Sequence, residues 1–258
     1  MCGLETQNLD RAKSVLDLLD SEPLQEQDAI RADQQAFGTL LTSGMRHARF
    51  SDDSGAEVRV HVYDKKPLET LLGIDLLIYL QLYDAYILIQ YKMMQKSKRA
   101  DERWYYTTDA HMQKQLATMK RVVSSIPPPA SGPMPIRDWR LNEEAFFWKF
   151  CESTRDSDAD GALVHGITLC RTHLESFLAL PASAGPNGGR RVGYGNCQRY
   201  LTTTQFVDLA QAGWIGGGPG MRHTMEDILA ANQQGGRQVL LTAVSQARQL
   251  DELRRGWK

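Results

Sequence analysis

The chain has 258 residues, of which 42% are hydrophobic and 24% are charged, and its formal net charge is −1. This length and composition are typical of a globular protein with a full hydrophobic core, arranged as one large domain or two small ones. The net charge near zero excludes a protein that is basic overall. A nucleic-acid surface would therefore need local clusters of Lys and Arg.

The apolar stretches argue against a membrane protein. The longest of them, residues 74–89, is interrupted by Gln81 and Asp84 and is too short to span a bilayer as a helix. The four cysteines are widely spaced, and no signal peptide precedes them. We therefore expect a reduced, cytoplasmic protein without membrane association.

The first half of the chain predicts a helix followed by strands. Residues 1–23 are polar and charged and predict an N-terminal arm, whereas residues 24–43 have the spacing of a first helix. Residues 57–63 alternate between polar and apolar side chains, which indicates a half-buried strand. Two richer apolar runs, 76–80 and 85–90, predict neighbouring strands joined by a hairpin.

The second half predicts further helices and strands. A helix over residues 110–124 follows a candidate N-cap at Thr107, Thr108 or Asp109. The proline-rich residues 126–133 indicate a stiff loop or linker. Later elements are strands at 145–151, 162–169 and 238–244 and helices at 204–212 and 224–232. This order predicts an α/β fold in which helices flank a mixed sheet.

Three polar side chains stand at the edges of the two central apolar runs. Asp75 begins one predicted strand, and Gln90 and Lys92 end the other, two residues apart and hence on one face. The Asp75 carboxylate, the Gln90 amide oxygen and the Tyr91 carbonyl are oxygen ligands of the kind that Mg²⁺ or Mn²⁺ takes. Lys92 could then hold the attacking water or stabilise a phosphate transition state.

This constellation resembles the PD-(D/E)XK nuclease superfamily, and within it the Mrr-like restriction endonuclease branch with glutamine in the second motif. The matching segments are GIDLLI at residues 73–78 and ILIQYK at residues 87–92, and the proline of the family name is absent before Asp75. The resemblance implies a restriction-endonuclease-like core over residues 24–152. Residues 153–258 would form a C-terminal α/β extension, either separate or part of the same domain.

Members of this superfamily often have a further acidic residue upstream. Glu69 lies six residues before Asp75, and Glu26 lies in the first predicted helix. We expect Glu69 to be the fourth member of the catalytic group beside Asp75, Gln90 and Lys92. Glu26 remains the alternative.

A basic run follows the second motif and predicts contacts to nucleic-acid phosphates. Its cationic residues are Lys96, Lys98, Arg99 and Arg103. Trp104, Tyr105 and Tyr106 come next; they either stack on bases or enter the core, and we expect the second.

The resemblance implies a metal-dependent DNA endonuclease that hydrolyses phosphodiester bonds with Mg²⁺ or Mn²⁺, in restriction or defence against foreign DNA. One alternative is a catalytically inactive nuclease-fold protein that serves as a nucleic-acid-binding or assembly subunit, because Gln90 is a weaker ligand than a carboxylate. Another is an unrelated α/β interaction protein. DNA is the expected partner and RNA the alternative, and a homodimer and a partner subunit both remain open.

Overall fold

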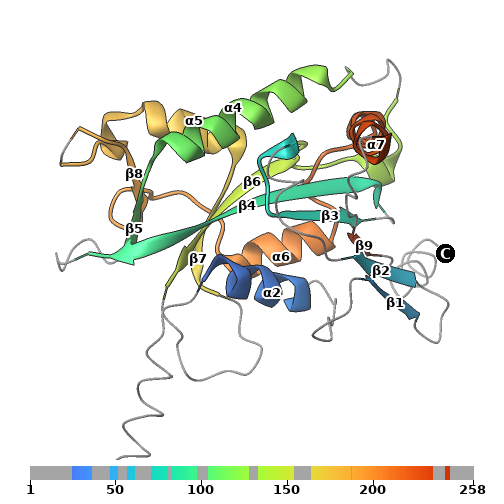
Figure 1. Ribbon diagram of the computed structural model, residues 1–258, viewed down its shortest axis with the longest axis horizontal. Helices are drawn as coiled ribbons and strands as arrows, with labels where there is room; N and C mark the ends of the chain where they lie inside the picture. The colour runs from blue at the N-terminus through green and yellow to red at the C-terminus, as the bar shows by residue number, and fades with distance from the viewer. Residues whose placement is uncertain are drawn as a thin grey trace, which may run out of the picture.

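The computed structural model describes residues 25–36, 47–51, 57–61, 71–80, 83–97, 104–127, 133–153, 164–186, 188–234 and 242–244. In chain order the elements are α2 (Glu26–Ala36), β1 (His47–Ser51), β2 (Glu57–His61), β3 (Leu76–Leu80), β4 (Ala85–Lys96), β5 (Trp104–Thr107), α4 (Ala110–Ser125), η2 (Ile136–Asp138), β6 (Phe146–Glu152), β7 (Gly166–Cys170), α5 (Arg171–Ala179), η3 (Pro181–Ser183), β8 (Arg191–Gly193), α6 (Thr203–Gln211), α7 (Pro219–Gln234) and β9 (Thr242–Val244). Figure 1 shows these elements as a curled sheet with helices on both faces.

The strands form one mixed sheet with β3, β4 and β6 at its centre. β3 runs antiparallel to β4, β4 parallel to β6, and β6 antiparallel to β7. β9 pairs in parallel with β3 and antiparallel with β2, while β5 and β8 extend from the end of β4. Strands from both sides of residue 152 therefore share one sheet. The structure therefore confirms the expected α/β class and the mixed sheet flanked by helices (Figure 1).

β4 is a long central strand whose sequence follows from its burial on both faces. Residues 85–92 are all buried, because β3 and β6 flank the strand and helices cover both of its faces. Such a strand is apolar in an uninterrupted run rather than in alternation. The sequence predicts an end near residue 90, but the strand continues to Lys96. The extension is stabilised by pairing of Gln95 and Lys96 with β5.

Two hydrophobic clusters, one on each face of the sheet, make up the core. On one face α4, α5 and α7 pack through residues such as Met112, Leu174 and Met221. On the other face α2 and α6 pack through Ile30 and Phe206. The ribbon shows the same layers, with α4, α5 and α7 above the sheet and α2 and α6 below it (Figure 1).

Some elements differ from the expectation in their length or existence. α4 agrees closely, and Asp109 is its N-cap, accepting a hydrogen bond from the Met112 backbone N–H at 2.7 Å. α7 begins earlier than expected, at Pro219, whose fixed φ suits a first helical turn. The short elements β1, β5, α5 and β8 were not anticipated, since their runs are too brief to show a period. In the described part of the chain, every helix is too short or too polar to cross a bilayer.

Candidate active site

Asp75 is positioned by a glycine turn that precedes β3. Gly73 has φ +70°, a left-handed conformation that favours glycine, and a Cβ atom there would lie 2.8 Å from the carbonyl oxygen of Gln115 on α4. The turn therefore packs directly against the helix. The Asp75 backbone N–H then donates to the Ile89 carbonyl at 2.9 Å, which fixes the residue at the start of the β3–β4 pairing.

The structure brings Asp75, Gln90 and the backbone of Tyr91 into direct contact. The Gln90 side-chain amide donates from Nε2 to Asp75 Oδ2 at 2.5 Å and to the Tyr91 carbonyl at 3.1 Å. The Tyr91 backbone N–H donates to the same Asp75 oxygen at 2.9 Å. Two oxygens from different strands thus face one point, which the partly positive Nε2 group occupies.

Gln90 is buried, and only the nitrogen of its side-chain amide is hydrogen-bonded. Its Oε1 atom is buried and has no hydrogen-bond partner, which normally costs about 1–3 kcal/mol. A buried amide oxygen without a partner, on a residue whose nitrogen contacts a carboxylate and a carbonyl, offers the oxygen types that a hard divalent cation takes. Mg²⁺ or Mn²⁺ therefore fits these residues in chemical type, with Asp75, Gln90 and Tyr91 as the groups that would hold it.

Few further side chains of the kinds that bind metals lie together in the described residues. Among the residues that the structure describes, no three His, Cys, Asp or Glu side chains gather as a metal-binding group. A cation here would depend on one carboxylate and neutral oxygens, with water completing its shell. Glu69, the expected fourth acidic residue, lies outside the described residues.

Lys92 lies on the same face of β4 as Gln90, and it is only 6% exposed. Its register partner is Phe150, and the Phe150 ring lies 5.7 Å from that of Tyr106. The Tyr106 hydroxyl in turn donates to Asp109 at 2.9 Å. Lys92 therefore lies in the sheet near the start of α4, where its charge acts on the N-cap Asp109.

Asp109 was expected only as a helix cap, but it also belongs to the electrostatic environment of the site. Burial raises the pKa of the Asp109 carboxyl, yet the hydrogen bonds from Met112 and Tyr106 and the charges of Lys92 and His111 outweigh burial and lower it. Asp109 is thus an anion close to the Lys92 ammonium. Its capping position was the only signal in the sequence, and that signal did not indicate the neighbourhood of Lys92.

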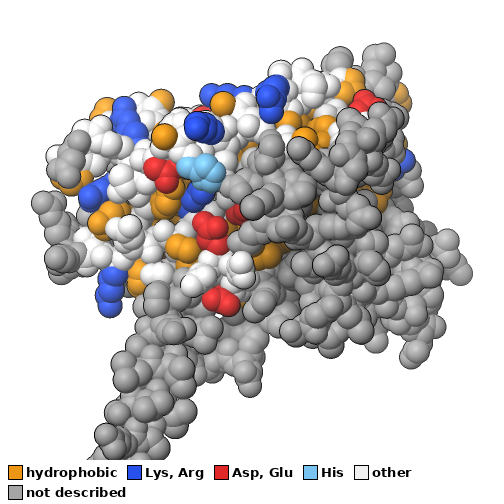
Figure 2. All heavy atoms as spheres, viewed as in Figure 1, with side chains coloured by type: hydrophobic (Ala, Val, Ile, Leu, Met, Phe, Trp, Pro, Cys, Tyr) orange, Lys and Arg blue, Asp and Glu red, His pale blue; other side chains and the backbone are white. Residues whose placement is uncertain are grey.

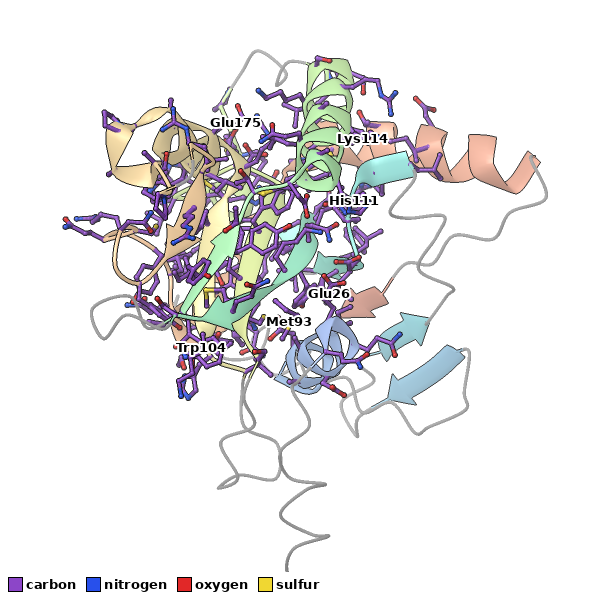
Figure 3. The ribbon with its side chains drawn as sticks, turned by 60° about the vertical axis from the view of Figure 1, so that its left-hand side comes forward. Glu26, Met93, Trp104, His111, Lys114 and Glu175 are labelled. Atoms are coloured by element: carbon purple, nitrogen blue, oxygen red, sulfur yellow. The ribbon has the colours of Figure 1, made fainter. Side chains whose placement is uncertain are left out.

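Glu26 at the start of α2 acts on the same region. Burial raises the pKa of Tyr106, and the hydrogen bond to Asp109 and the charges of Asp109 and Glu26 raise it further. Figure 3 shows Glu26 at the beginning of α2, near Met93 of β4 in that view, and His111 in the first turn of α4. The charge of Glu26 therefore acts on Tyr106, whose hydroxyl donates to Asp109.

The predicted phosphate-binding run is described only in part. Lys96 is exposed at the end of β4, and Lys98, Arg99 and Arg103 lie outside the described residues. Trp104 is 8% exposed and enters the core, as expected. Tyr105 is partly exposed, and the Arg191 guanidinium lies 4.2 Å from its ring centroid.

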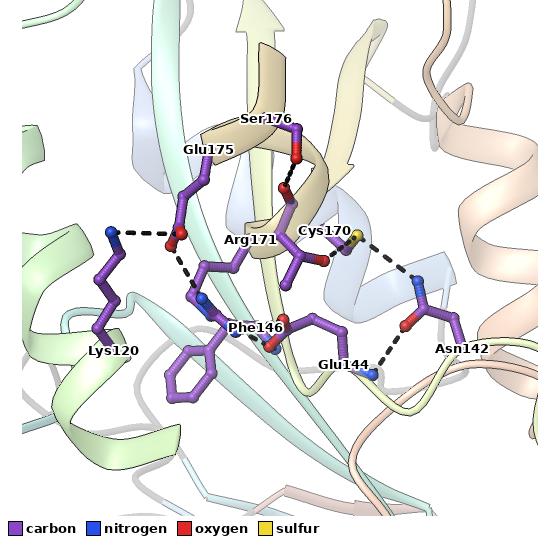
Figure 4. Close-up of polar contacts among 9 residues, drawn as sticks. Lys120, Asn142, Glu144, Phe146, Cys170, Arg171, Glu175 and Ser176 are labelled. Atoms are coloured by element: carbon purple, nitrogen blue, oxygen red, sulfur yellow. Dashed lines mark hydrogen bonds and ion pairs between the residues drawn. The ribbon is translucent and has the colours of Figure 1, made fainter. Parts of the chain in front are cut away.

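A second polar network ties three elements together on the face that α4 covers. Arg171 at the start of α5 donates to Glu144 at 2.8 Å and to Glu175 at 2.9 Å, and Glu175 also pairs with Lys120 of α4 at 3.3 Å (Figure 4). Burial raises the pKa of Glu144, which the Arg171 charge opposes. Every charged member has a counter-ion, so this network joins α4, α5 and the start of β6.

No family model matches the sequence, and neither a curated protein nor a solved structure matches the chain. The chemical interpretation of the site therefore depends on its own geometry.

Proposed function

We propose that the chain is a metal-dependent phosphodiesterase with a PD-(D/E)XK-like active site that cleaves DNA. The observation that carries this proposal is the convergence of the Asp75 carboxylate and the Tyr91 carbonyl on the Gln90 amide, whose own oxygen is buried without a partner. A purely structural amide at this position would be expected to satisfy both of its polar atoms. A carboxylate, a backbone carbonyl and an amide oxygen together would supply the oxygen ligands that Mg²⁺ prefers.

The Gln90 amide can supply the missing ligand by a local rotation. Turning the terminal torsion by half a turn exchanges Nε2 and Oε1, two atoms that have nearly the same shape. The amide oxygen would then join Asp75 Oδ2 and the Tyr91 carbonyl as a third donor. A bound divalent cation would lower the pKa of a coordinated water and neutralise charge that develops on the phosphate.

Lys92 supports the same chemistry from the same strand face. Lys92 is mostly buried and its charge acts on the Asp109 carboxyl, and a positive charge in such a position acts more strongly than in bulk water. In this proposal Lys92 stabilises the negative charge of the phosphate as the attacking water adds to it. Asp109 supplies a compensating negative charge near Lys92 and is not itself a catalytic residue.

Plasmid cleavage and Mn²⁺ binding test the proposal together. We expect nicking of supercoiled plasmid in Mg²⁺ or Mn²⁺, and we expect Asp75→Asn and Lys92→Met to lower it by about 10²-fold or more. Asp75→Asn should also abolish Mn²⁺ binding followed by electron paramagnetic resonance. The control Asp208→Asn removes the same charge from an exposed position of α6, on the opposite face of the sheet. It should leave both plasmid cleavage and Mn²⁺ binding unchanged. Cleavage that persists in both site variants would show that this site is not responsible.

One observation favours a second function, that of a nucleic-acid-binding or assembly subunit without turnover. Asp75 Oδ2 already accepts hydrogen bonds from the Tyr91 backbone and the Gln90 amide, so the carboxylate is stabilised in the absence of a cation. A protein of this kind would bind DNA equally well with and without Mg²⁺ and would not nick it. Mn²⁺ titration separates the two functions, because only the first requires a bound cation.

A further inference from the structure

Helix α4 has an unbalanced charge distribution for a surface helix. Its 16 residues include three Lys or Arg residues and no Asp or Glu. Its inner face, with Met112, Leu116 and Met119, is buried against the sheet. The cationic side chains must therefore project from the flanks and the outer face of the helix.

The three cations do not share one flank. Lys114 and Arg121 are seven residues apart, which places them within about 20° of each other around the helix and about 10.5 Å apart along its axis. Both are exposed. Lys120 points toward α5, where Glu175 pairs with it at 3.3 Å. Lys114 and Arg121 form no ion pair with another described residue, so they make up an uncompensated positive stripe.

The stripe lies on the outer face of α4, and the buried face of the same helix turns borders the candidate active site. The backbone of Gln115, the neighbour of Lys114, contacts the Gly73 turn that holds Asp75. The N-cap Asp109 lies within the field of Lys92. Figure 3 shows His111 and Lys114 along the first turns of the helix, and Figure 2 shows Lys and Arg side chains over α4 on the face in view.

We propose that the stripe formed by Lys114 and Arg121 binds the phosphate backbone of a nucleic acid and leads it to the N-terminal end of α4, where Asp75 and Lys92 lie. A spacing of about 10.5 Å along the helix lets the two long side chains contact different phosphates of one backbone. The proposed binding surface is therefore on α4. The destination of the strand rests on the proposed function, whereas the phosphate contacts do not.

The chemistry of the helix favours a nucleic acid over an anionic membrane. A helix that lies on a bilayer needs a face of large apolar side chains, opposite its cationic face, that is free to enter the membrane. The exposed uncharged residues of α4 are small or polar, and its large apolar residues are buried in the core. Contacts to nucleic-acid phosphates require exposed cations and no apolar face, and Lys114 and Arg121 meet that requirement.

The test compares two double variants that remove the same charge. Lys114→Ala/Arg121→Ala deletes the stripe, and Lys120→Ala/Arg199→Ala deletes one paired cation of α4 and one exposed arginine between β8 and α6. Binding of two unrelated fluorescent duplexes is measured by anisotropy in EDTA over a range of KCl concentrations. EDTA prevents metal-dependent cleavage, so binding is measured apart from turnover.

We expect the stripe variant to flatten the slope of log K against log salt by about 1.8, or about 0.9 for each lost phosphate contact, equally for both duplexes. The matched variant should change the slope by less than half of that. Equal flattening by the two variants, or no DNA binding by the native protein, would overturn the proposal. So would loss of binding to phosphatidylserine vesicles in the stripe variant with DNA binding unchanged. If the native protein cleaves plasmid and the stripe variant binds and cleaves DNA as well as the native protein does, this surface is contradicted while the proposed function stands.

Discussion

The ammonium of Lys149 on β6 pairs with the carboxylate of Asp33 on α2, and neither side chain is exposed to solvent. The Tyr91 hydroxyl donates to the second Asp33 oxygen at 2.6 Å, and its backbone N–H donates to Asp75, just before β3. Burial raises the pKa of Tyr91, and Asp33 raises it further, so the hydroxyl stays a neutral donor. Tyr91 thus connects the buried pair on one face with the candidate site on the other.

Breaking this pair on one side should be costly. Lys149→Met leaves the Asp33 carboxylate buried without its counter-ion, and we expect a loss of about 3–5 kcal/mol in the free energy of unfolding. The double variant Asp33→Leu/Lys149→Met removes both charges and should recover most of that loss. Urea denaturation followed by circular dichroism measures both. A double variant less stable than the single one would contradict the assignment of the cost to the unpaired charge.

Gly73 should tolerate no side chain, for two separate reasons. Gly73→Ala combines a left-handed φ with a Cβ atom that would meet the Gln115 carbonyl at 2.8 Å. Gly188 has φ +81° with nothing within 4 Å of a Cβ atom, so Gly188→Ala carries the backbone strain alone. We expect about 1 kcal/mol for Gly188→Ala and clearly more for Gly73→Ala, measured by thermal unfolding. Equal losses would show that the turn moves away from α4 without cost.

Arg171 should contribute far more to stability than Lys120, although both pair with Glu175. Arg171→Met leaves the buried Glu144 without its cation, at a cost of about 3–5 kcal/mol. Lys120→Met removes an exposed pair worth about 0–1 kcal/mol. Urea titrations of the two variants at neutral pH test this ranking, which a larger loss for Lys120→Met would reverse.

The Arg171→Met defect should also depend on pH. Burial already raises the pKa of Glu144, and the loss of Arg171 raises it further. A carboxyl with a folded pKa above its unfolded value destabilises the protein as the pH rises from the unfolded pKa through the folded one. The deficit should therefore be largest at neutral pH and shrink as the pH falls toward the ordinary glutamate range. A deficit that does not change with pH would assign the loss to packing.

Gln90→Glu should make the site depend on a cation for its stability. A second carboxylate beside Asp75 repels it in the apo protein and removes the N–H donor to Asp75 and Tyr91. With Mn²⁺, the same carboxylate is a stronger ligand than the amide. We expect a lower melting temperature without metal and a larger increase on adding Mn²⁺ than in the native protein. Scanning calorimetry with and without Mn²⁺ decides, and an increase no larger than that of the native protein would argue against a cation at this position.

Local patterns in the sequence were sufficient for the elements that carry the site. The apolar runs of β3 and β4 and the spacing and Asp109 cap of α4 predict these elements within a few residues, because burial and capping act within a turn or a strand. The proximity of Asp75 and Gln90 could also be predicted, since a short hairpin joins their strands. The short strands β5 and β8 could not, because each is stabilised by its partner strand and not by its own residues.

The sequence by itself determined the strand pair that holds Asp75 and Gln90 and the existence of α4 as an amphipathic helix. Only the tertiary structure decided that Asp33 would neutralise Lys149 across 116 residues, and that the start of α4 would lie beside Lys92. The reason is physical. Hydrophobic periodicity fixes which residues are buried, whereas the partner of a buried charge depends on which distant segments the sheet topology brings together.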